Sequence, residues 1–281
     1  MRAGVFSPNR IGSDAAIFNV VAEQLRKRGC EVKLYNEEQF LSGAVTENVI
    51  INMCREPQSI ELLQELEDKG ALVINSGYGI ENCARERMTR ILLGSNIPYP
   101  ESIIVNTDEG IRDTLTRMHM DRCWIKRADT QSLHKEDVSY VRNPEEAQEV
   151  LQEYFLRGIK RAVICRHLEG DLLKFYGVAG TPFFYSFFPY KAAAARDPRN
   201  GAPLEDNTPV FDQSQLERIC NRAADILDVR IYGGDAIVGA DGSVRIIDFD
   251  DFPSFSPCRT EAAPYIAKCV MAEIKKHSQR S

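Results

Sequence analysis

Residues 232–251 read YGGDAIVGADGSVRIIDFDD, and they predict a β-hairpin that carries acidic side chains. Asp241-Gly242 is a strong signal for a two-residue turn between two apolar runs. A turn there places Asp235 opposite Asp248, and Asp250 shares a face with Asp248 because side chains alternate along a strand. The register therefore predicts three carboxylates on one patch.

Three carboxylates on one patch are unusual, since strands tend to exclude aspartate. Two carboxylates about 4 Å apart repel by roughly 4 kcal/mol at an effective dielectric near 20, so we expect this repulsion to destabilise the ligand-free protein. Hard oxygen ligands suit Mg²⁺, which usually accompanies phosphate. The sequence thus favours a magnesium site formed by Asp235, Asp248 and Asp250. The alternative is a group of exposed acids at the fraying end of a hairpin.

The composition narrows the functional classes. With 281 residues, of which 43% are apolar and 27% charged, the chain is typical of a soluble globular protein with two domains or several lobes. The net charge of −6 argues against a nucleic-acid-binding surface. We expect no signal peptide and no membrane-spanning segment, because no apolar run is long enough. Eight scattered cysteines without a C-x-x-C pair predict reduced, mostly buried thiols in a cytoplasmic protein.

Strand and helix signals alternate along the chain, which indicates an α/β fold. Within residues 1–80 this rhythm predicts a small parallel sheet, with helices at 14–28 and 57–69. Further helices are predicted at 81–95, 144–156, 213–227 and 259–277. The chain contains neither a G-x-G-x-x-G nor a G-x-x-x-x-G-K-[ST] motif, so the usual dinucleotide and P-loop phosphate sites are not expected.

Two motifs carry a resemblance to a known superfamily. GGDAIV (residues 233–238) and IIDFDDFPSF (246–255) resemble the G-x-D-hydrophobic strand and the [DE]-x-N-x-x-P strand end of ATP-grasp proteins. The resemblance extends to RimK-like carboxylate–amine ligases and to inositol-phosphate kinases related to inositol trisphosphate 5/6-kinase. It implies metal ligation by Asp235, Asp248 and Asp250. The sequence departs from the family at Asp250, where asparagine is usual; aspartate keeps an oxygen ligand and adds a negative charge.

Other segments match the family in order and spacing. CWIKR (123–127) resembles the strand with an ATP-contacting lysine, here Lys126. AVICRHLEGDLLKFYGV (162–178) resembles the hinge that holds adenine, and RERMTRILLGSNIPYP (85–100) resembles a D-K-x-x-T segment. The ATP-binding residues that these segments imply are Arg87, Lys126, Arg166, His167, Leu168 and Lys174. The family's Gln-Glu pair is replaced by Cys165-Arg166, so we expect adenine to be held largely by the backbone.

The resemblance implies an ATP-grasp fold with an N-terminal Rossmann-like pre-ATP-grasp domain. Residues 1–80 correspond to this α/β domain, residues 81–167 to a linker helix and the small ATP-grasp lobe, and residues 168–281 to the large lobe with the metal site. ATP and Mg²⁺ are the implied cofactors. Catalysis then consists mainly of positioning and of neutralising charge during in-line transfer of the γ-phosphoryl group.

Three functions are compatible with this resemblance. In a RimK-like ligase the acceptor is a carboxylate, an acylphosphate forms, and an amine attacks it. In an inositol-phosphate-type kinase the acceptor is a hydroxyl group; Asp at 248, where many ligases have Glu, favours this alternative. A non-catalytic ATP-binding regulatory protein is the third. The superfamily consists mostly of ligases, so we predict a ligase.

The predicted acceptor is a small anionic molecule. The basic residues that we assign to it are Arg10, Arg55, Lys135 and Arg259, and for each the alternative is a solvated surface side chain. Arg259 is the strongest of these, because it opens a helix close to the metal strand and helix N-termini favour anions. Lys174 and Arg259 are the predicted catalytic residues. No nucleic-acid or membrane partner is expected, and a homo-oligomer is compatible with the sequence.

Overall fold

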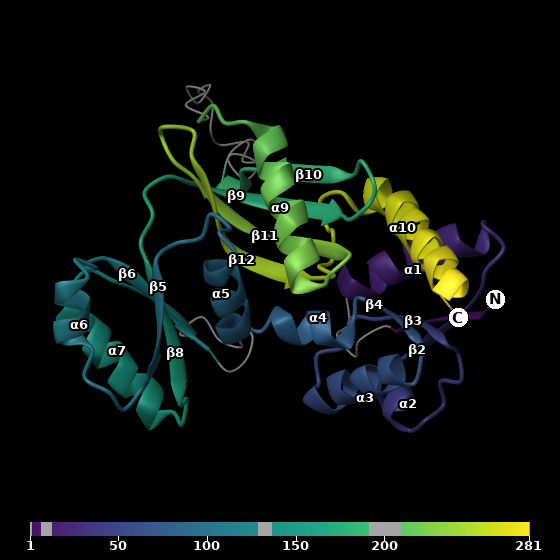
Figure 1. The fold of residues 1–281 in the computed structure, drawn as a ribbon, viewed down its shortest axis with the longest axis horizontal. Coiled ribbons are helices and arrows are strands. Elements are labelled where there is room, and N and C mark those ends of the chain that lie inside the picture. The colour runs from purple at the N-terminus through teal and green to yellow at the C-terminus, as the bar shows by residue number, and fades with distance from the viewer. Residues whose placement is uncertain (1, 7–12, 129–136, 191–208, 281) are drawn as a thin grey trace, which may run out of the picture.

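Three four-stranded sheets lie along the long axis of the molecule (Figure 1). The computed structural model describes residues 2–6, 13–128, 137–190 and 209–280. The predicted positions Arg10 and Lys135 fall outside the described residues. Of the helices described, none has the length and apolar character that crossing a membrane requires.

The first sheet is parallel, as the sequence predicts, with strand order β2-β1-β3-β4. Its elements are β1 (Arg2–Phe6), α1 (Ser13–Arg26), β2 (Glu31–Tyr35), α2 (Glu37–Leu41), β3 (Val49–Ile51), α3 (Pro57–Asp68) and β4 (Leu72–Ile74). The short helix α2 was not predicted. Asn36 caps it, because the side-chain oxygen of Asn36 accepts a hydrogen bond from the Gln39 N–H at 2.8 Å.

The predicted helix 81–95 is two helices, α4 (Gly77–Asn82) and α5 (Arg85–Gly94). Met88 and Leu92 of α5 are fully buried in a core shared with the third sheet, not with the second. In the predicted division, residues 81–167 comprise a linker helix and the small lobe, and α5 lies in the linker part of that range.

The second sheet is antiparallel, with strand order β5-β8-β6-β7. Its elements are β5 (Ser102–Asn106), α6 (Arg112–Arg117), β6 (Cys123–Arg127), β7 (Val138–Val141), α7 (Pro144–Leu156) and β8 (Arg161–Arg166). Helix α7 has the predicted bounds 144–156, and the Asn143 side chain caps it by accepting from the Glu146 N–H at 2.8 Å. The two helices lie on one side of the sheet, where their apolar residues form its core (Figure 1).

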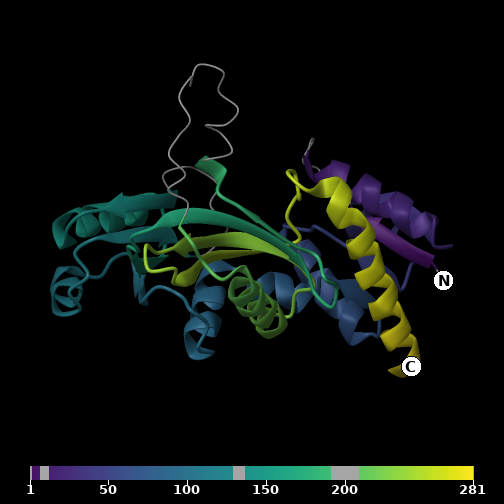
Figure 2. The same ribbon diagram turned by 90° about the horizontal axis from the view of Figure 1, so that it is seen from above.

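The third sheet is also antiparallel, with strand order β10-β9-β11-β12, and it lies between the other two (Figures 1 and 2). Its strands are β9 (Asp171–Val178), β10 (Phe184–Phe187), β11 (Ile231–Val238) and β12 (Val244–Asp251). Helix α9 (Gln213–Leu227) and α5 pack on one face. The C-terminal helix α10 (Arg259–Arg280) packs beside α1, so both ends of the described chain belong to the same region (Figure 2).

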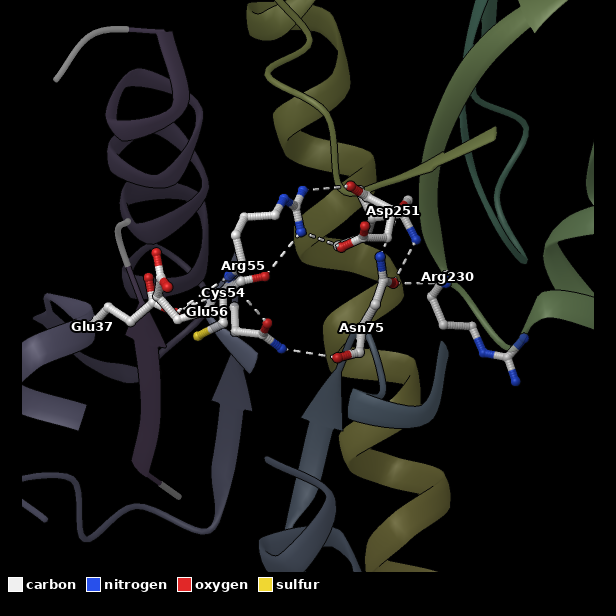
Figure 3. A network of polar contacts seen from close by, with 9 residues as sticks. Glu37, Cys54, Arg55, Glu56, Asn75, Arg230 and Asp251 are labelled. Atoms are coloured by element: carbon white, nitrogen blue, oxygen red, sulfur yellow. Dashed lines mark hydrogen bonds and ion pairs between the residues drawn. The ribbon is translucent and has the colours of Figure 1, made fainter. Parts of the chain in front are cut away.

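A polar network joins the first sheet to the third (Figure 3). The Asn75 side chain accepts from the backbone N–H groups of Arg230 and Ile231 and donates to the Ile231 carbonyl, at 2.7–2.9 Å. Arg55 donates from Nη1 to the Asp251 carboxylate at 2.7 Å and from Nη2 to the Asp251 carbonyl at 3.0 Å. The segments that follow β3 and β4 are thus bonded to the start of β11 and to the end of β12, the two strands that carry the acids.

Candidate active site

The β11–β12 hairpin pairs Asp235 with Asp248, as predicted, but by a different route. The loop spans five residues, 239–243, instead of the two-residue turn, so Val238 lies opposite Val244 and the register near the loop is shifted by one. A β-bulge then restores the predicted register, because Ile247 is an extra residue on β12. Bulges of this kind re-aim groups beside functional sites. Here the Ile247 carbonyl accepts a hydrogen bond from the Lys126 ammonium group at 3.0 Å.

A cavity of about 490 Å³ opens between the second and third sheets. The predicted site residues that line it are Lys126, Arg166, His167, Leu168, Asp235 and Asp248. They come from β6, from the segment between β8 and β9, and from the β11–β12 hairpin. The sequence thus located residues from three separate segments that the fold brings to one cavity.

Arg85 is a lining residue that the sequence interpretation missed. Its side chain is 8% exposed, and its guanidinium contacts the Asp248 carboxylate at 3.4–3.5 Å while Nε is buried without a hydrogen bond to any described residue. The predicted residue Arg87 lies outside the cavity, half exposed, and pairs with Glu81 at 2.9 Å. Residues two apart on a helix point in different directions. Arg85 shares the buried face of α5 with Met88 and Leu92. This helical spacing in the sequence indicates that Arg85, and not Arg87, points inward.

The acids of the site differ in their electrostatic surroundings. Burial raises the pKa of Asp248, but the positive charges of Arg85 and Lys126 outweigh it and hold that pKa below its usual range. Burial raises the pKa of Asp235 above its usual range, although Lys174 offsets part of this through an ion pair of 2.6 Å. Burial and the charges of Asp248 and Asp235 raise the pKa of Asp250 to about 7. The three carboxylates therefore interact, as their register predicts.

The three carboxylates do not form a ready-made metal site. Within the described part of the chain, no three His, Cys, Asp or Glu side chains are grouped so that they could hold a metal ion. Lys174 and Arg85 already contact two of the acids. The assignment of all three as ligands therefore stays a prediction.

The hinge segment between β8 and β9 contributes Arg166, His167, Leu168 and Gly170 to the lining of the cavity. The Arg166 side chain turns toward the second sheet, where it pairs with Glu101 at 2.5 Å and donates to the carbonyls of Met118 and His119. The N–H groups of Arg166 and His167 bond to the carbonyls of Glu101 and Arg122. Among the described residues, none accepts a hydrogen bond from the Leu168 N–H.

The remaining basic residues have other contacts. Arg55, predicted above to bind the acceptor, pairs with Asp251 at 2.7 Å, and its role toward the acceptor stays a prediction. Arg259 opens α10, as predicted, and donates to the Ser254 carbonyl at 3.4 Å and to the Ser256 hydroxyl at 3.3 Å. It does not line the cavity. Its role in catalysis or acceptor binding stays a prediction.

Comparison with solved structures identifies the fold. D-alanine–D-alanine ligase from Bacillus anthracis, complexed with ATP, matches with a TM-score of 0.70 at 13% identity, and the match covers 100% of both chains. A RimK-domain ATP-grasp protein from Sphaerobacter thermophilus matches with a TM-score of 0.70 at 15% identity over 96% of this chain and 100% of that one.

The ATP-grasp ligase PsnB, complexed with its precursor peptide PsnA2 and AMPPNP, matches with a TM-score of 0.63 at 16% identity, covering 98% of each chain. No protein-family model and no curated protein matches the sequence. The chain has the ATP-grasp fold predicted from its motifs; at these identities the likeness establishes the fold alone.

Proposed function

We propose that the protein is an ATP-dependent carboxylate–amine ligase that acts through an acylphosphate. The observation that carries this proposal is the convergence of Lys126, Arg85, Asp235 and Asp248 at one cavity between the two antiparallel sheets. Cations that can hold phosphate oxygens and carboxylates that can hold a metal ion occur there together. Both are needed where charge must be neutralised during phosphoryl transfer.

In this proposal ATP occupies the cavity with its base at one end and its phosphates at the other. The base lies at the hinge, where the Leu168 N–H offers a hydrogen-bond donor and where Trp124 and His167 form part of the wall. Trp124 Nε1 donates to His167 Nδ1 at 3.1 Å, which fixes the imidazole ring. The phosphates then extend toward Lys126 and Arg85. These two side chains are almost completely buried, so their charges act on a bound phosphate with little screening by solvent.

The donor set fits Mg²⁺. Magnesium is usually held by one or two carboxylates together with substrate phosphates, so a cluster of three protein ligands is not required. Asp248 and Asp250 are the residues that would hold it, because Asp235 is paired with Lys174. The raised pKa of Asp250, caused by burial and by neighbouring acids, shows an excess of negative charge that a cation would relieve. When bound, the metal ion would neutralise charge on the transferring phosphoryl group.

The reaction then proceeds in two balanced steps. A carboxylate oxygen of the acceptor attacks the γ-phosphorus in line, the bond from phosphorus to the bridging oxygen breaks, and ADP leaves. The amine nitrogen next attacks the acyl carbon, the bond from that carbon to the phosphate oxygen breaks, and the proton lost from the nitrogen goes to the leaving phosphate, which gives the amide and inorganic phosphate. Lys126 and Arg85 hold the phosphate oxygens in both steps, and Lys174 keeps the Asp235 carboxylate in place.

The choice of a ligase over a kinase is supported by the solved structures of similar fold, in which ligases recur. The eight free thiols, seven of them buried, support a reducing, cytoplasmic location. We assign a small anionic acceptor because a carboxylate oxygen must attack the γ-phosphorus of ATP beside Asp248 and Asp250.

Product analysis tests the proposal. The protein is incubated with ATP, Mg²⁺ and pooled metabolites, with Asp248→Asn as the inactive control and Arg218→Ala, an exposed residue outside the site, as the active one. A ligase gives an amide, ADP and inorganic phosphate. A phosphorylated product with ADP and no free phosphate identifies a kinase instead. ATP binding without turnover across the pool contradicts both and identifies a regulatory nucleotide-binding protein.

A further inference from the structure

The first turn of α5 lies where the second and third sheets meet (Figure 1). Arg85 and Glu86 are neighbours there, and neighbouring residues of a helix do not face each other. The Arg85 guanidinium contacts the Asp248 carboxylate of the third sheet at 3.4–3.5 Å. The Glu86 carboxylate accepts from two nitrogens of Arg161, the first residue of β8 in the second sheet, at 2.6 and 2.9 Å. One helical turn thus contacts both sheets beside the cavity.

A closed path of bonds connects Arg85 with Lys126, another buried cation of the cavity. Lys126 belongs to β6, and two residues beyond it Ala128 donates its N–H to the Arg161 carbonyl at 3.2 Å. The Ala128 carbonyl accepts from the Glu86 N–H at 3.4 Å. The Arg161 side chain then returns to the carboxylate of Glu86, which follows Arg85 in the chain. The segments that carry the two cations are therefore joined by backbone bonds and by the Glu86–Arg161 ion pair.

The two cations need such a connection because their charges repel each other. Burial raises the pKa of Asp248, but both cations lower it, so both charges lie close to that carboxylate. Lys126 also donates to the carbonyl of the adjacent residue Ile247 at 3.0 Å. In the ligand-free site Asp248 offsets part of the repulsion between the cations. In the proposed function Asp248 holds Mg²⁺ and the cations hold phosphate oxygens, so contacts outside the cavity are needed to maintain their spacing.

The Glu86–Arg161 pair is suited to positioning more than to stabilising the fold. Burial raises the pKa of Glu86, but hydrogen bonds from Arg161 and Arg90 outweigh it and hold that pKa below its usual range. Glu86 is therefore ionised at neutral pH. Its pair with Arg161 is bidentate, which adds geometric specificity. The Arg161 and Glu86 side chains are 36% and 26% exposed, and pairs this open to water contribute little to overall stability.

We propose that Glu86 and Arg161 are positioning residues that hold Arg85 and Lys126 at the spacing required by the phosphates of ATP. This inference rests on the ATP site of the proposed function, but not on the identity of the acceptor. Glu86 and Arg161 are not among the residues that line the cavity, so they act through the two cations and not by contact with the nucleotide. Without the pair, α5 and β6 can move apart, and a charge-assisted contact to the bound phosphates is weakened.

Calorimetry with Mg²⁺ and AMPPNP, a non-hydrolysable analogue of ATP, tests the proposal on the full-length protein. Arg161→Ala should raise the Kd about tenfold, as expected when one charge-assisted contact to phosphate is weakened. Arg90→Ala is the matched control. Arg90 donates to the same Glu86 carboxylate at 2.9 Å, but it lies on α5 itself and is 58% exposed. Both variants remove one positive charge and one partner of Glu86, but only Arg161→Ala breaks the link to the second sheet, so Arg90→Ala should change the Kd by less than about twofold.

Two further variants separate positioning from a general effect on the fold. Arg161→Ala also removes a bond of 2.9 Å to the Asn106 side chain. Glu86→Ala leaves that bond in place and should raise the Kd by a similar factor, and it gives the same comparison if Arg161→Ala does not fold. In an Arg85→Ala background, Arg161→Ala should have little further effect, because no pair of cations is left to be spaced.

The outcomes distinguish the positioning role from the function on which it rests. An equal Kd for Arg161→Ala and Arg90→Ala overturns the positioning role while the nucleotide site stands. An Arg161→Ala effect that persists in full in the Arg85→Ala background also overturns it, because the pair then acts on the fold in general. Absence of AMPPNP binding by the wild type overturns the ATP site and the positioning role with it. Binding of AMPPNP without any product in the metabolite assay overturns the ligase function alone, and the comparison of variants still decides the positioning role.

Discussion

Replacing Arg55 with alanine should destabilise the protein through a residue that lies far from it in sequence. Arg55 follows β3 of the N-terminal domain, and its guanidinium bonds twice to Asp251 at the end of β12 (Figure 3). The Asp251 side chain is only 1% exposed, and its second carboxylate oxygen is buried without a hydrogen bond to a described residue. Arg55 is therefore the main compensation for a buried negative charge.

The magnitude follows from this burial. Removing one partner of a buried ion pair costs about 3–5 kcal/mol, because the remaining charge stays uncompensated. The Arg55 side chain is 28% exposed, so water screens part of the pair and we expect a loss of about 2–4 kcal/mol. Arg218→Ala, which removes an ion pair to Asp212 whose side chains are 68% and 56% exposed, should cost less than about 1 kcal/mol.

Urea unfolding followed by circular dichroism measures both changes. A double-mutant cycle with Asp251→Ala separates the pair from other contacts. Once the buried carboxylate is removed, deleting Arg55 should cost little, and the coupling should lie at about 1–3 kcal/mol. If Arg55→Ala destabilises the protein no more than Arg218→Ala, or if the two changes are additive, then the pair does not hold the N-terminal domain to β12.

Asp248→Asn should abolish Mg²⁺-dependent ATP turnover. It should also lower the free energy of unfolding by about 1–3 kcal/mol, since it leaves the buried Arg85 without its partner. Asp250→Asn should instead stabilise the ligand-free protein, and a change of the same sign for both variants in urea unfolding would contradict this. Lys126→Ala should weaken ATP binding more than adenosine binding in calorimetry, because a lysine charge acts on phosphate; equal weakening would assign it a structural role. Burial raises the pKa of Glu67 from about 4.5 to about 7, so the folded state favours the protonated form. The stabilisation that protonated Glu67 contributes is therefore fully present below pH 4.5 and is lost as the pH rises through 7. The loss is roughly 2 kcal/mol after allowance for partial exposure. Glu67→Gln should flatten the profile of melting temperature against pH.

Local patterns predicted much of the fold. The bounds of helices 144–156 and 213–227 follow from apolar periodicity and from capping by Asn143 and Asp212, which depend only on neighbouring residues. The predicted pairing of Asp235 with Asp248 also occurs. It agrees only because the longer loop and the bulge shift the register by one residue in opposite directions, so that the two shifts cancel. Turn signals fix a register only when no bulge intervenes.

Contacts between distant segments could not be predicted. The family pattern predicts Arg87, whereas Arg85 is the arginine on the buried face of α5. Arg55 was assigned to an anionic substrate, and the anion that it meets is Asp251, almost 200 residues further along the chain. The sequence of an acidic protein predicts that a basic residue will contact a negatively charged group. The sequence does not show whether the partner is a ligand or another part of the fold.

These pairings change the physical reason for expecting a metal ion. Repulsion among the acids suggested that an external cation was needed, but the protein provides most of the compensation itself. The ion pairs are Lys174–Asp235, Arg85–Asp248 and Arg55–Asp251. Asp250 is the fourth acid of this group, and it forms no ion pair with a described residue. Its pKa is the one raised to about 7, chiefly by burial and by the neighbouring carboxylates. The pair to Asp248 is the loosest, at 3.4 Å, so a divalent ion can replace Arg85 there at the least cost and leave this arginine to the phosphates. We therefore base the proposed magnesium site at Asp248 and Asp250 on the acids that the fold leaves weakly compensated, and not on the number of acids in the motif.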